Sequence, residues 1–476
     1  MENLPSKTLS PIDIYGLLPR TNCKDCGEAN CMAFAVKLVN KETLLRLCTP
    51  LVTEERFKRA YEELWKMLKP PIAEVEIGTG ERKVKIGGEY VLHRHELTYF
   101  NPTAIAIDVS DDMGEEEIVG RVKKTEDFIF TYIGMELKLD MLAIRSVLND
   151  QTRFRETVKK VADNTDLPLM LCALNPKAME AALQVVGDRR PLLYAATEQN
   201  WREMADLALK NKSPLAVFAP NDLTMLSSIT KTLTESGLTD LALDPGTIPK
   251  GGLSSMINAF TALRWKSLRD GDELFGFPLI GTPITAWVTL DGDPDIKAWW
   301  EACIANILIV RYADLLVMHS LKGWSLLPST FLRQNVYNDP RKPVSVKPGL
   351  RVLGNPDEYA PVMMTTNFAL TYYTVKSDIE TGKVDCYLLV VDSEGIAVDC
   401  AVAGRKITPD SIAEELKNSG VDQKVKHRIL TVPGKAARLS GEIEDATKLE
   451  WKVVVGPMDS SGIPKFVNTE WKSMDK

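Results

Sequence analysis

Four cysteines near the N-terminus constrain this sequence more than any other feature. Cys23, Cys26, Cys31 and Cys48 are spaced C-x2-C-x4-C-x16-C. Four thiolates within one small fold can hold either one tetrahedral zinc ion or one 4Fe-4S cluster. A zinc ion would only stabilise a loop, whereas a cluster would let the chain move electrons. The identity of the bound group therefore decides what kind of protein this is.

The spacing of the quartet favours the cluster. Structural zinc sites more often carry two C-x2-C pairs, and here only Cys23 and Cys26 have that spacing. The longer gap to Cys31, with Gly27 allowing a tight turn, is typical of a loop around a larger inorganic core. The pattern matches neither common ferredoxin spacing, so zinc stays open as the alternative.

Composition limits the partners and the compartment. The chain has 476 residues, a length that predicts about three domains. Its charged fraction is 26% and its net charge is −7, so we expect no general affinity for nucleic acid or anionic lipid. No secretory signal is recognised, and no stretch reaches the roughly 18 uninterrupted apolar residues of a membrane span. We therefore expect a cytoplasmic protein without membrane contact. There, clustered cysteines more often bind metal, and we expect ordinary buried thiols at the four others, Cys172, Cys303, Cys386 and Cys400.

The N-terminal segment, residues 1–65, is expected to form a small metal-binding domain. Helices are predicted over Met32–Val39 and Lys41–Cys48, the second ending at Pro50. Three of the cysteines then lie on a loop and at the start of a helix, and the fourth returns from the end of the next element. Lys69-Pro70-Pro71 marks a linker after this domain.

The middle of the chain predicts a closed barrel. A hairpin is expected first, from Glu74–Ile77 and Lys83–Ile86. Over residues 90–338, apolar runs alternate with amphipathic helices such as Pro176–Val186 and Trp201–Lys210. Eight such units over about 250 residues suit a (β/α)8 TIM barrel, with an open doubly wound sheet as the alternative. The expected strands begin near Ala104, Met141, Leu169, Leu192, Leu215, Leu241, Leu279 and Leu315.

Residues 360–468 are expected to form a small, open, Rossmann-like α/β domain, after a proline-rich linker over 340–361. Its apolar runs are Val362–Thr365, Tyr387–Val391, Ile396–Val402, Ile429–Val432 and Trp451–Val455. Its helices are expected over Ala369–Glu380, Pro409–Lys417 and about Lys435–Ala446. Ligands of such sheets lie beyond the carboxyl ends of the strands. Small, hydroxyl and glycine residues collect there, which would let a large flat ligand approach the backbone.

Histidines and barrel-end residues give weaker signals. The chain has four histidines, of which His93 and His95 point to one face of a predicted strand and are interpreted as structural or solvated, as against a metal pair. None of the four lies in the Asp-x-His-x-x-Gly element that supplies an imidazole to cobalt in many corrinoid proteins. Asn221 and Asp244 follow predicted barrel strands, where barrel enzymes keep catalytic groups, but a turn role is favoured for both.

Three motifs together resemble one known family. They are LPRTNCKDCGEANCMAFA from Leu18 to Ala35, TTNFALTY from Thr365 to Tyr372, and SGIPKF from Ser461 to Phe466. They closely resemble the large (gamma) subunit of the corrinoid iron–sulfur protein of the acetyl-CoA decarbonylase/synthase system. The resemblance spans essentially the whole chain, in the same three-part order.

The resemblance implies a 4Fe-4S domain, a central TIM barrel and a C-terminal corrinoid-binding domain. It implies that the cluster ligands are Cys23, Cys26, Cys31 and Cys48. It also implies that a corrinoid (a cobamide) is contacted by Thr365, Thr371, Gly395, Ile396, Ala397, Val398, Gly434, Gly456 and Ser461.

The family's activity is methyl transfer. The cobalt accepts a methyl group from an N5-methyl-tetrahydropterin and passes it to the nickel site of acetyl-CoA synthase, or the reverse, while the cluster reduces inactive Co(II) to Co(I). The partners implied are a small (delta) subunit as heterodimer, acetyl-CoA synthase, a methyl-tetrahydropterin methyltransferase, and CO dehydrogenase or a ferredoxin. Two alternatives remain: a catalytic barrel with methyltetrahydropterin:corrinoid methyltransferase activity, or a zinc-stapled scaffold subunit.

Overall fold

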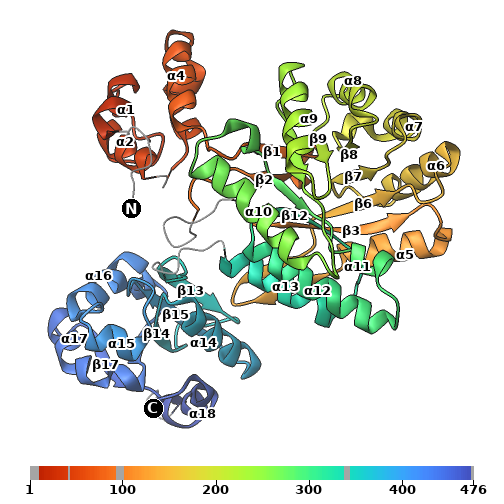
Figure 1. Cartoon of the computed structure of the whole chain (residues 1–476). Coiled ribbons are helices and arrows are strands. Elements are labelled where there is room, and N and C mark those ends of the chain that lie inside the picture. The colour runs from red at the N-terminus through yellow and green to blue at the C-terminus, as the bar shows by residue number, and fades with distance from the viewer. Residues whose placement is uncertain (1–9, 41–42, 93–100, 337–342, 473–476) are drawn as a thin grey trace. The chain divides into compact units, whose positions relative to one another are not determined.

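The computed structural model describes residues 10–40, 43–92, 101–336 and 343–472 (Figure 1). Two compact units are present. The first carries the N-terminal helices and a barrel, and the second carries a five-stranded sheet. His93 and His95 lie outside the described residues.

Four short helices form the N-terminal head: α1 (Pro11–Leu17), α2 (Cys31–Val39), α3 (Thr49–Thr53) and α4 (Lys58–Leu68). Ser10 caps α1, because its side chain accepts a hydrogen bond from the Ile12 amide and Asp13 bonds back to the cap. Asn30 caps α2 in a similar way, through the Ala33 amide.

The prediction of a helix over Lys41–Cys48 is wrong for the described part of that range. Only a single 3-10 turn, Leu45–Leu47, occurs there, with extended backbone at Leu44 and Cys48 on either side. Pro50 was expected to end a helix, but it lies in the first turn of α3, where proline costs no hydrogen bond. Pro50 therefore starts a helix immediately after Cys48.

The closed barrel is confirmed. Eight parallel strands are paired in the order β10-β11-β12-β3-β6-β7-β8-β9, and pairing of Leu315 with Ala104 closes the ring. The open-sheet alternative is thereby excluded. The strands are β3 (Ala104–Ser110), β6 (Met141–Arg145), β7 (Leu169–Cys172), β8 (Leu192–Ala196), β9 (Leu215–Phe218), β10 (Leu241–Asp244), β11 (Leu279–Gly281) and β12 (Ala313–Met318).

Helices surround the barrel (Figure 1). They are α5 (Glu115–Glu126), α6 (Gln151–Ala162), α7 (Pro176–Val186), α8 (Trp201–Asn211), α9 (Leu223–Glu235), α10 (Leu253–Leu268), α11 (Thr285–Thr289), α12 (Pro294–Val310) and α13 (Gly323–Val336). A second, exposed hairpin was not anticipated. It consists of β4 (Ile129–Tyr132) and β5 (Met135–Lys138), inserted between α5 and β6.

Small side chains fill much of the barrel interior. The inner cluster includes alanines from five strands: Ala104, Ala106, Ala143, Ala195, Ala216 and Ala242. The hairpin of β1 (Glu74–Ile77) and β2 (Val84–Gly87) adds the fully buried Val75, Ile77 and Ile86 to the same cluster. Close packing requires that this volume be filled, so the hairpin completes a core that alanines alone would leave open.

The second unit is built on one open sheet, in the order β13-β15-β14-β16-β17. Its strands are β13 (Gly349–Leu353), β14 (Val362–Thr366), β15 (Cys386–Val391), β16 (Ile429–Val432) and β17 (Lys452–Val455). The last four are parallel, whereas β13 pairs antiparallel with β15 at the edge. The linker expected over 340–361 thus contains a strand of this sheet, which begins before the expected boundary at residue 360. Pro348 precedes β13 directly and Pro356 follows it, so the prolines flank the strand without interrupting it.

The strand expected over Ile396–Val402 is also wrong. This run forms the helix α15 (Val398–Ala403), with Val398, Ala401 and Val402 buried and Asp399 exposed between them. The spacing of three and four is that of a helix face. Both edges of β15 are already paired, with β13 and β14, so the run packs against the sheet instead of joining it.

Helices cover both faces of this sheet. One face packs on α14 (Ala369–Thr381) and α18 (Ile463–Phe466). The other packs on α15, α16 (Pro409–Ser419), the 3-10 helix η7 (Gly434–Leu439) and α17 (Ser440–Ala446). The single helix expected over about Lys435–Ala446 is therefore split into η7 and α17. The result is a doubly wound sheet whose strand order reverses at β14.

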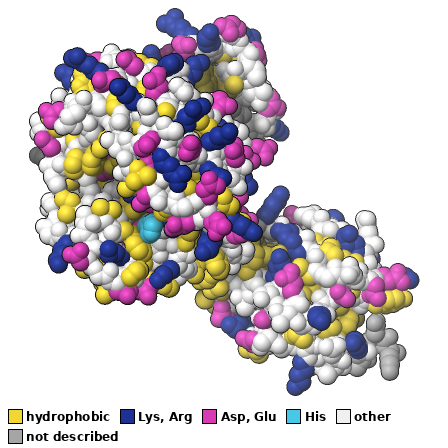
Figure 2. Space-filling view, turned by 90° about the vertical axis from the view of Figure 1, so that its right-hand side faces the viewer, with side chains coloured by type: hydrophobic (Ala, Val, Ile, Leu, Met, Phe, Trp, Pro, Cys, Tyr) yellow, Lys and Arg dark blue, Asp and Glu magenta, His cyan; other side chains and the backbone are white. Residues whose placement is uncertain are grey.

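The surface carries both signs of charge. On the face drawn in Figure 2, basic and acidic side chains are interspersed. Among the described residues, no helix is long and apolar enough to cross a membrane.

We predict that Ile77→Ala destabilises the barrel by about 2–5 kcal/mol, because the substitution opens a cavity among residues that cannot close it. Ile77 is 0% exposed. Thermal unfolding followed by circular dichroism measures the effect. Glu76→Ala on the same strand is the control, since Glu76 makes only a surface ion pair with Lys83 at 2.9 Å. Equal midpoints for the two variants would contradict the role of the hairpin as a plug.

Candidate functional site

The head places its four cysteines around one small apolar cluster. Cys31 and Cys48 are buried in that cluster and Cys26 packs against it, while Cys23 is exposed. Cys31 is the first residue of α2, and Cys48 is the residue immediately before α3. All four are free thiols.

The cysteine loop is held by local hydrogen bonds. The side chain of Asn22 accepts a hydrogen bond from the Cys31 amide at 2.9 Å, which ties the start of the loop to the helix. Positive φ angles at Asn22, Lys24 and Gly27 curl the chain between these points. This curled loop joins Cys23 and Cys26 to the start of α2 at Cys31.

Electrostatics show that the four thiols are near one another. Burial raises the pKa of the Cys48 thiol above its usual value, and Cys31, Cys26 and Cys23 each raise it further. A hydrogen bond from the Leu51 backbone acts in the opposite direction. Soft sulfur donors are the ligands that iron–sulfur clusters and zinc bind. Within the described residues, no group of three or more His, Cys, Asp or Glu side chains is arranged to hold a single metal ion.

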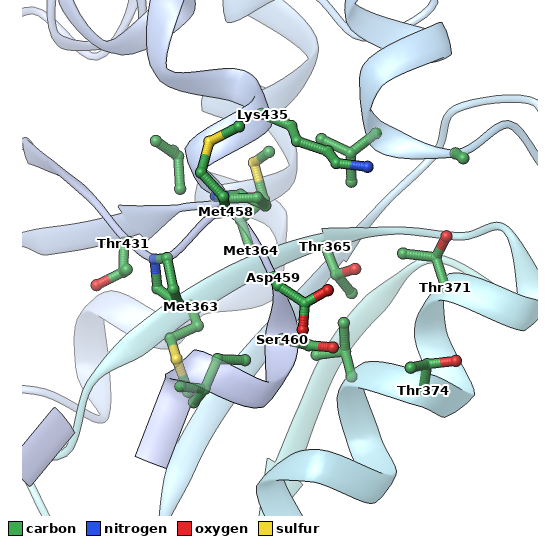
Figure 3. Close-up of a pocket in the computed structure, with 18 of the residues that line it drawn as sticks. Met363, Met364, Thr365, Thr371, Thr374, Thr431, Lys435, Met458, Asp459 and Ser460 are labelled. Carbon is green, nitrogen blue, oxygen red and sulfur yellow. The ribbon is translucent and has the colours of Figure 1, made fainter. Parts of the chain in front are cut away.

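A pocket opens at the carboxyl edge of the second unit's sheet (Figure 3). It lies where β14, β16 and β17 end, next to the point at which the strand order reverses. Its volume is ≈ 240 Å³. Doubly wound sheets bind ligands at this position because the loops that follow neighbouring strands diverge there.

Two buried hydroxyl groups in this pocket lack hydrogen-bond partners. Thr365 is 1% exposed and Thr431 is 4% exposed, and Oγ1 of each makes no hydrogen bond to any residue that the structure describes. An unsatisfied buried hydroxyl costs about 1–3 kcal/mol. The pocket therefore offers polar groups that a ligand could satisfy.

Threonines and charges line the rim. Figure 3 shows Thr371 and Thr374 on one helix, α14, with Thr431 and Met458 on the opposite side. Lys435 Nζ lies 3.3 Å from Asp399 Oδ2. The pKa of the Asp399 carboxyl is lowered, first by a hydrogen bond from the Cys400 backbone and then by the neighbouring Lys435 ammonium.

Five of the nine expected corrinoid contacts line the pocket: Thr365, Thr371, Ala397, Val398 and Gly456. The other four do not line it, namely Gly395, Ile396, Gly434 and Ser461. The hydroxyl of Ser460, one residue before Ser461, lies in the pocket wall and donates to Asp378 at 2.5 Å.

The glycines near the pocket were expected to let a large flat ligand approach the backbone, but the structure gives a different reason for them. A Cβ on Gly456 would lie 2.8 Å from Thr431 Cγ2, and one on Gly434 would lie 2.7 Å from Met458 Sδ. Gly395 has a φ of 73° and its Cβ would lie 2.8 Å from Pro343. The chain's own packing therefore accounts for these three glycines, without an approaching ligand.

Sequence reasoning missed several lining residues. Thr374 follows Thr371 by three positions and so shares its helix face, a signal that could have been used. Thr431 is inside a strand and Lys435 lies beyond it, and neither carries a motif. The remaining missed residues are Met363, Met364, Leu370, Val375, Leu388, Asp399, Val432 and Ile463.

At the barrel's carboxyl end, Asp244 is a buried acid. Its Oδ2 accepts a 2.7 Å hydrogen bond from the Tyr194 hydroxyl and its Oδ1 accepts one from the Gly246 amide, so it combines a turn role with a side-chain pair. Burial raises the pKa of Asp244 to about 6, although both hydrogen bonds lower it. Asn221 is an exposed turn residue with a φ of 60°.

The two described histidines are structural in their contacts. His319 Nδ1 lies 2.7 Å from Asp108 Oδ1, and its ring packs 4.4 Å from that of Trp287. His427 Nε2 bonds the Ala360 carbonyl at 2.9 Å.

Comparisons with known proteins agree over nearly the whole chain. A family model described as CO dehydrogenase/acetyl-CoA synthase delta subunit matches residues 74–467, and one described as putative Fe-S cluster matches residues 18–50. The acetyl-CoA decarbonylase/synthase complex subunit gamma 2 of Methanosarcina thermophila is 45% identical over 98% of this chain and 99% of its own. The gamma subunit of Archaeoglobus fulgidus is 44% identical over the same shares.

The chain therefore belongs to the CO dehydrogenase/acetyl-CoA synthase delta subunit family, and its full-length relatives carry the name gamma. The match to the second family model supports an iron–sulfur cofactor. Among solved structures, dihydropteroate synthase from Thermus thermophilus has a TM-score of 0.38 at 14% identity, covering 55% of this chain and 99% of its own. That likeness is too weak to bear on function.

The raised pKa of Asp244 predicts a pH-dependent stability. The protonated acid is favoured in the folded state, so its contribution is complete below the unfolded value of 3.8 and is lost as the pH rises through about 6. The loss is on the order of 3 kcal/mol. Asp244→Asn should remove this part of the pH dependence of the thermal midpoint between about pH 4 and 7. Burial also raises the pKa of Glu89 to about 8, and Glu89 contributes the same pH dependence of stability to the unmodified protein and to the Asp244→Asn variant. Thermal midpoints that change with pH in the same way in the unmodified protein and in Asp244→Asn would contradict the role of Asp244 in this pH dependence.

Proposed function

We propose that the chain is a methyl-group carrier of the acetyl-CoA decarbonylase/synthase system. In this proposal the head binds a 4Fe-4S cluster and the pocket of the second unit binds a corrinoid. The observation that carries the corrinoid half is the pair of unpartnered, buried hydroxyls of Thr365 and Thr431 at the edge where doubly wound sheets bind ligands.

The proposed cluster ligands are Cys23, Cys26, Cys31 and Cys48. Support comes from the proximity of their thiols, from the curled loop that joins the first two to α2, and from the family match over residues 18–50. When bound, the cluster would supply low-potential electrons, since iron–sulfur potentials reach about −700 mV. The work of the chain is to exclude water from two of the four sulfurs, those of the buried Cys31 and Cys48.

The proposed corrinoid contacts are Thr365, Thr371, Ala397, Val398 and Gly456, together with Thr374, Thr431 and Lys435 from the pocket wall. We keep Gly395, Ile396, Gly434 and Ser461 as positions that shape the loops around it. When bound, the corrinoid would supply a cobalt centre that accepts and releases a methyl group. Hydroxyls and the Lys435 ammonium suit the amide-rich edge of such a ring as donors.

The pocket is smaller than a corrinoid, so it can hold only part of the ring. A second wall from a partner protein would account for the rest, and we propose the small (delta) subunit of the same system as that partner. Acetyl-CoA synthase, a methyl-tetrahydropterin methyltransferase, and CO dehydrogenase or a ferredoxin follow as transfer partners. A cytoplasmic location is part of this proposal.

For the cluster, we predict that Cys48→Ala lowers the iron content of the anaerobically purified chain by at least about half, because a cube held by three thiolates is exposed and labile. The 400 nm region of the absorption spectrum should fall with it. Cys303→Ala is the matched control, since Cys303 is a partly buried thiol of α12 in the barrel. Zinc in place of iron in the unmodified protein would support the scaffold alternative and overturn the redox role.

For the corrinoid, we predict that Thr371→Trp lowers cobamide affinity by about tenfold or more, because the indole fills the pocket from α14. Equilibrium dialysis against a cobamide measures the loss, and the iron content should not change. Thr381→Trp is the matched control: the same substitution on the same helix, at an exposed position outside the pocket. Equal binding by both variants would place the corrinoid elsewhere.

A further inference from the structure

A second cavity occupies the carboxyl mouth of the barrel, far in sequence from the residues of the proposed corrinoid pocket. Its volume is ≈ 240 Å³, somewhat below the about 300–1,000 Å³ typical of ligand sites. Its floor includes Met170 and Val317 of the inner barrel cluster, where many neighbouring positions are alanine. The short side chains beneath it explain why the mouth is hollow.

One end of the cavity carries an incompletely used guanidinium group. Arg145 is the last residue of β6, and its Nε and Nη2 contact Asp108 Oδ2 at 2.9 and 2.8 Å. Its Nη1 makes no hydrogen bond to a residue that the structure describes. The side chain of Arg145 is 27% exposed and lines the cavity.

Arg145 shares its carboxylate partner, Asp108, with a second guanidinium group and a histidine. Asp108 is fully buried and also binds Arg121 at 2.8 Å and His319 at 2.7 Å, so two guanidinium groups share one carboxylate. Burial alone would raise the pKa of Asp108, but His319, Arg121 and Arg145 outweigh it and lower that pKa. Asp244 does not line the cavity, and its oxygens already accept from Tyr194 and Gly246. An anionic group in the cavity would complete the pairing of Arg145.

The opposite end of the cavity offers hydroxyl groups. Strand β10 is four strands from β6 in either direction round the barrel, so Thr247, which follows β10, lies across the mouth from Arg145. Thr282, which follows the adjacent β11, donates its amide to Thr247 Oγ1 at 2.9 Å. The hydroxyl of Thr282 makes no hydrogen bond to any described residue. Between the two ends, the rings of Tyr194 and Phe218 lie 5.7 Å apart on one wall.

We infer that the barrel mouth is a binding site for a small organic carboxylate with a flat apolar body. The carboxylate pairs with Arg145, the body lies against Tyr194, Phe218 and Met170, and a polar group at the far end reaches Thr282. Arginine suits the first contact because its guanidinium carries five N–H donors, so Nη1 remains available while Nε and Nη2 contact Asp108. A mostly apolar lining with a few polar groups at opposite ends fixes the orientation of such a ligand.

The test titrates the full-length chain with benzoate, with the neutral benzamide and with 4-hydroxybenzoate, using isothermal titration calorimetry and ligand-observed NMR. Benzoate should bind at least about tenfold more tightly than benzamide, a ratio that corresponds to about 1.4 kcal/mol. Arg145→Gln should abolish that preference. Arg202→Gln, an exposed arginine of α8, is the control and should not change it.

A second variant protects the test against misfolding. Asp108 keeps Arg121 and His319 as partners when Arg145 is replaced, so Arg145→Gln should fold. Thr282→Val preserves shape and removes a hydroxyl that bonds to no described residue, and it should lower the affinity for 4-hydroxybenzoate severalfold while leaving benzoate unchanged. Three results would each overturn the inference: equal binding of benzoate and benzamide, unchanged benzoate binding in Arg145→Gln, or no millimolar binding of either carboxylate by the unmodified chain.

Discussion

Parallel pairing of strands is the constraint on which both candidate ligand sites depend. Parallel neighbours bring their carboxyl ends to one edge, so the residues that follow successive strands meet there although they are far apart in sequence. In the second unit this brings Thr365 and Thr431 together, and in the barrel it brings Arg145 across from Thr247. The antiparallel β13 contributes no residue to the pocket, which agrees with its role as an edge strand.

Hydrogen-bond satisfaction differs between closely spaced residues at the carboxyl edge of the second unit's sheet. Asn367, next to the pocket, has both ends of its side chain used: Oδ1 accepts from Ser393 and Gly395, and Nδ2 donates to Asp392. The hydroxyl of Thr365, two residues earlier, makes no hydrogen bond to any described residue. Native proteins leave few buried polar groups unsatisfied. The contrast within three residues is the strongest local reason to expect a polar ligand at this edge.

The sequence predicted those elements whose pattern has only one interpretation. Eight barrel strands start at or within two residues of their expected positions, because both faces of each are buried and their apolar runs are bounded by turn residues. Short apolar runs with two interpretations failed: Ile396–Val402 became a helix once both edges of β15 were occupied. The strand β13 and the hairpin β4–β5 were missed, since exposed edge strands need little apolar sequence.

The candidate site was predictable to a smaller extent. Thr365 and Thr371 were expected from the family resemblance, because their place near a strand end alone left a capping or turn role equally open. Thr431 and Lys435 were missed, because only the strand order brings β16 beside β14. Asp244 and Tyr194 were not linked for the same reason, as 50 residues separate them. Pairings of this kind depend on topology, which no local pattern encodes.

Hydrogen–deuterium exchange with and without an added cobamide tests the central claim most directly. The account predicts slower exchange on cobamide binding at the three segments that meet at the pocket, around Thr365–Val375, Thr431–Lys435 and Gly456–Ser460. The cysteine head, residues 18–50, should not change. Protection confined to the barrel, or no protection at the sheet edge, would contradict the account.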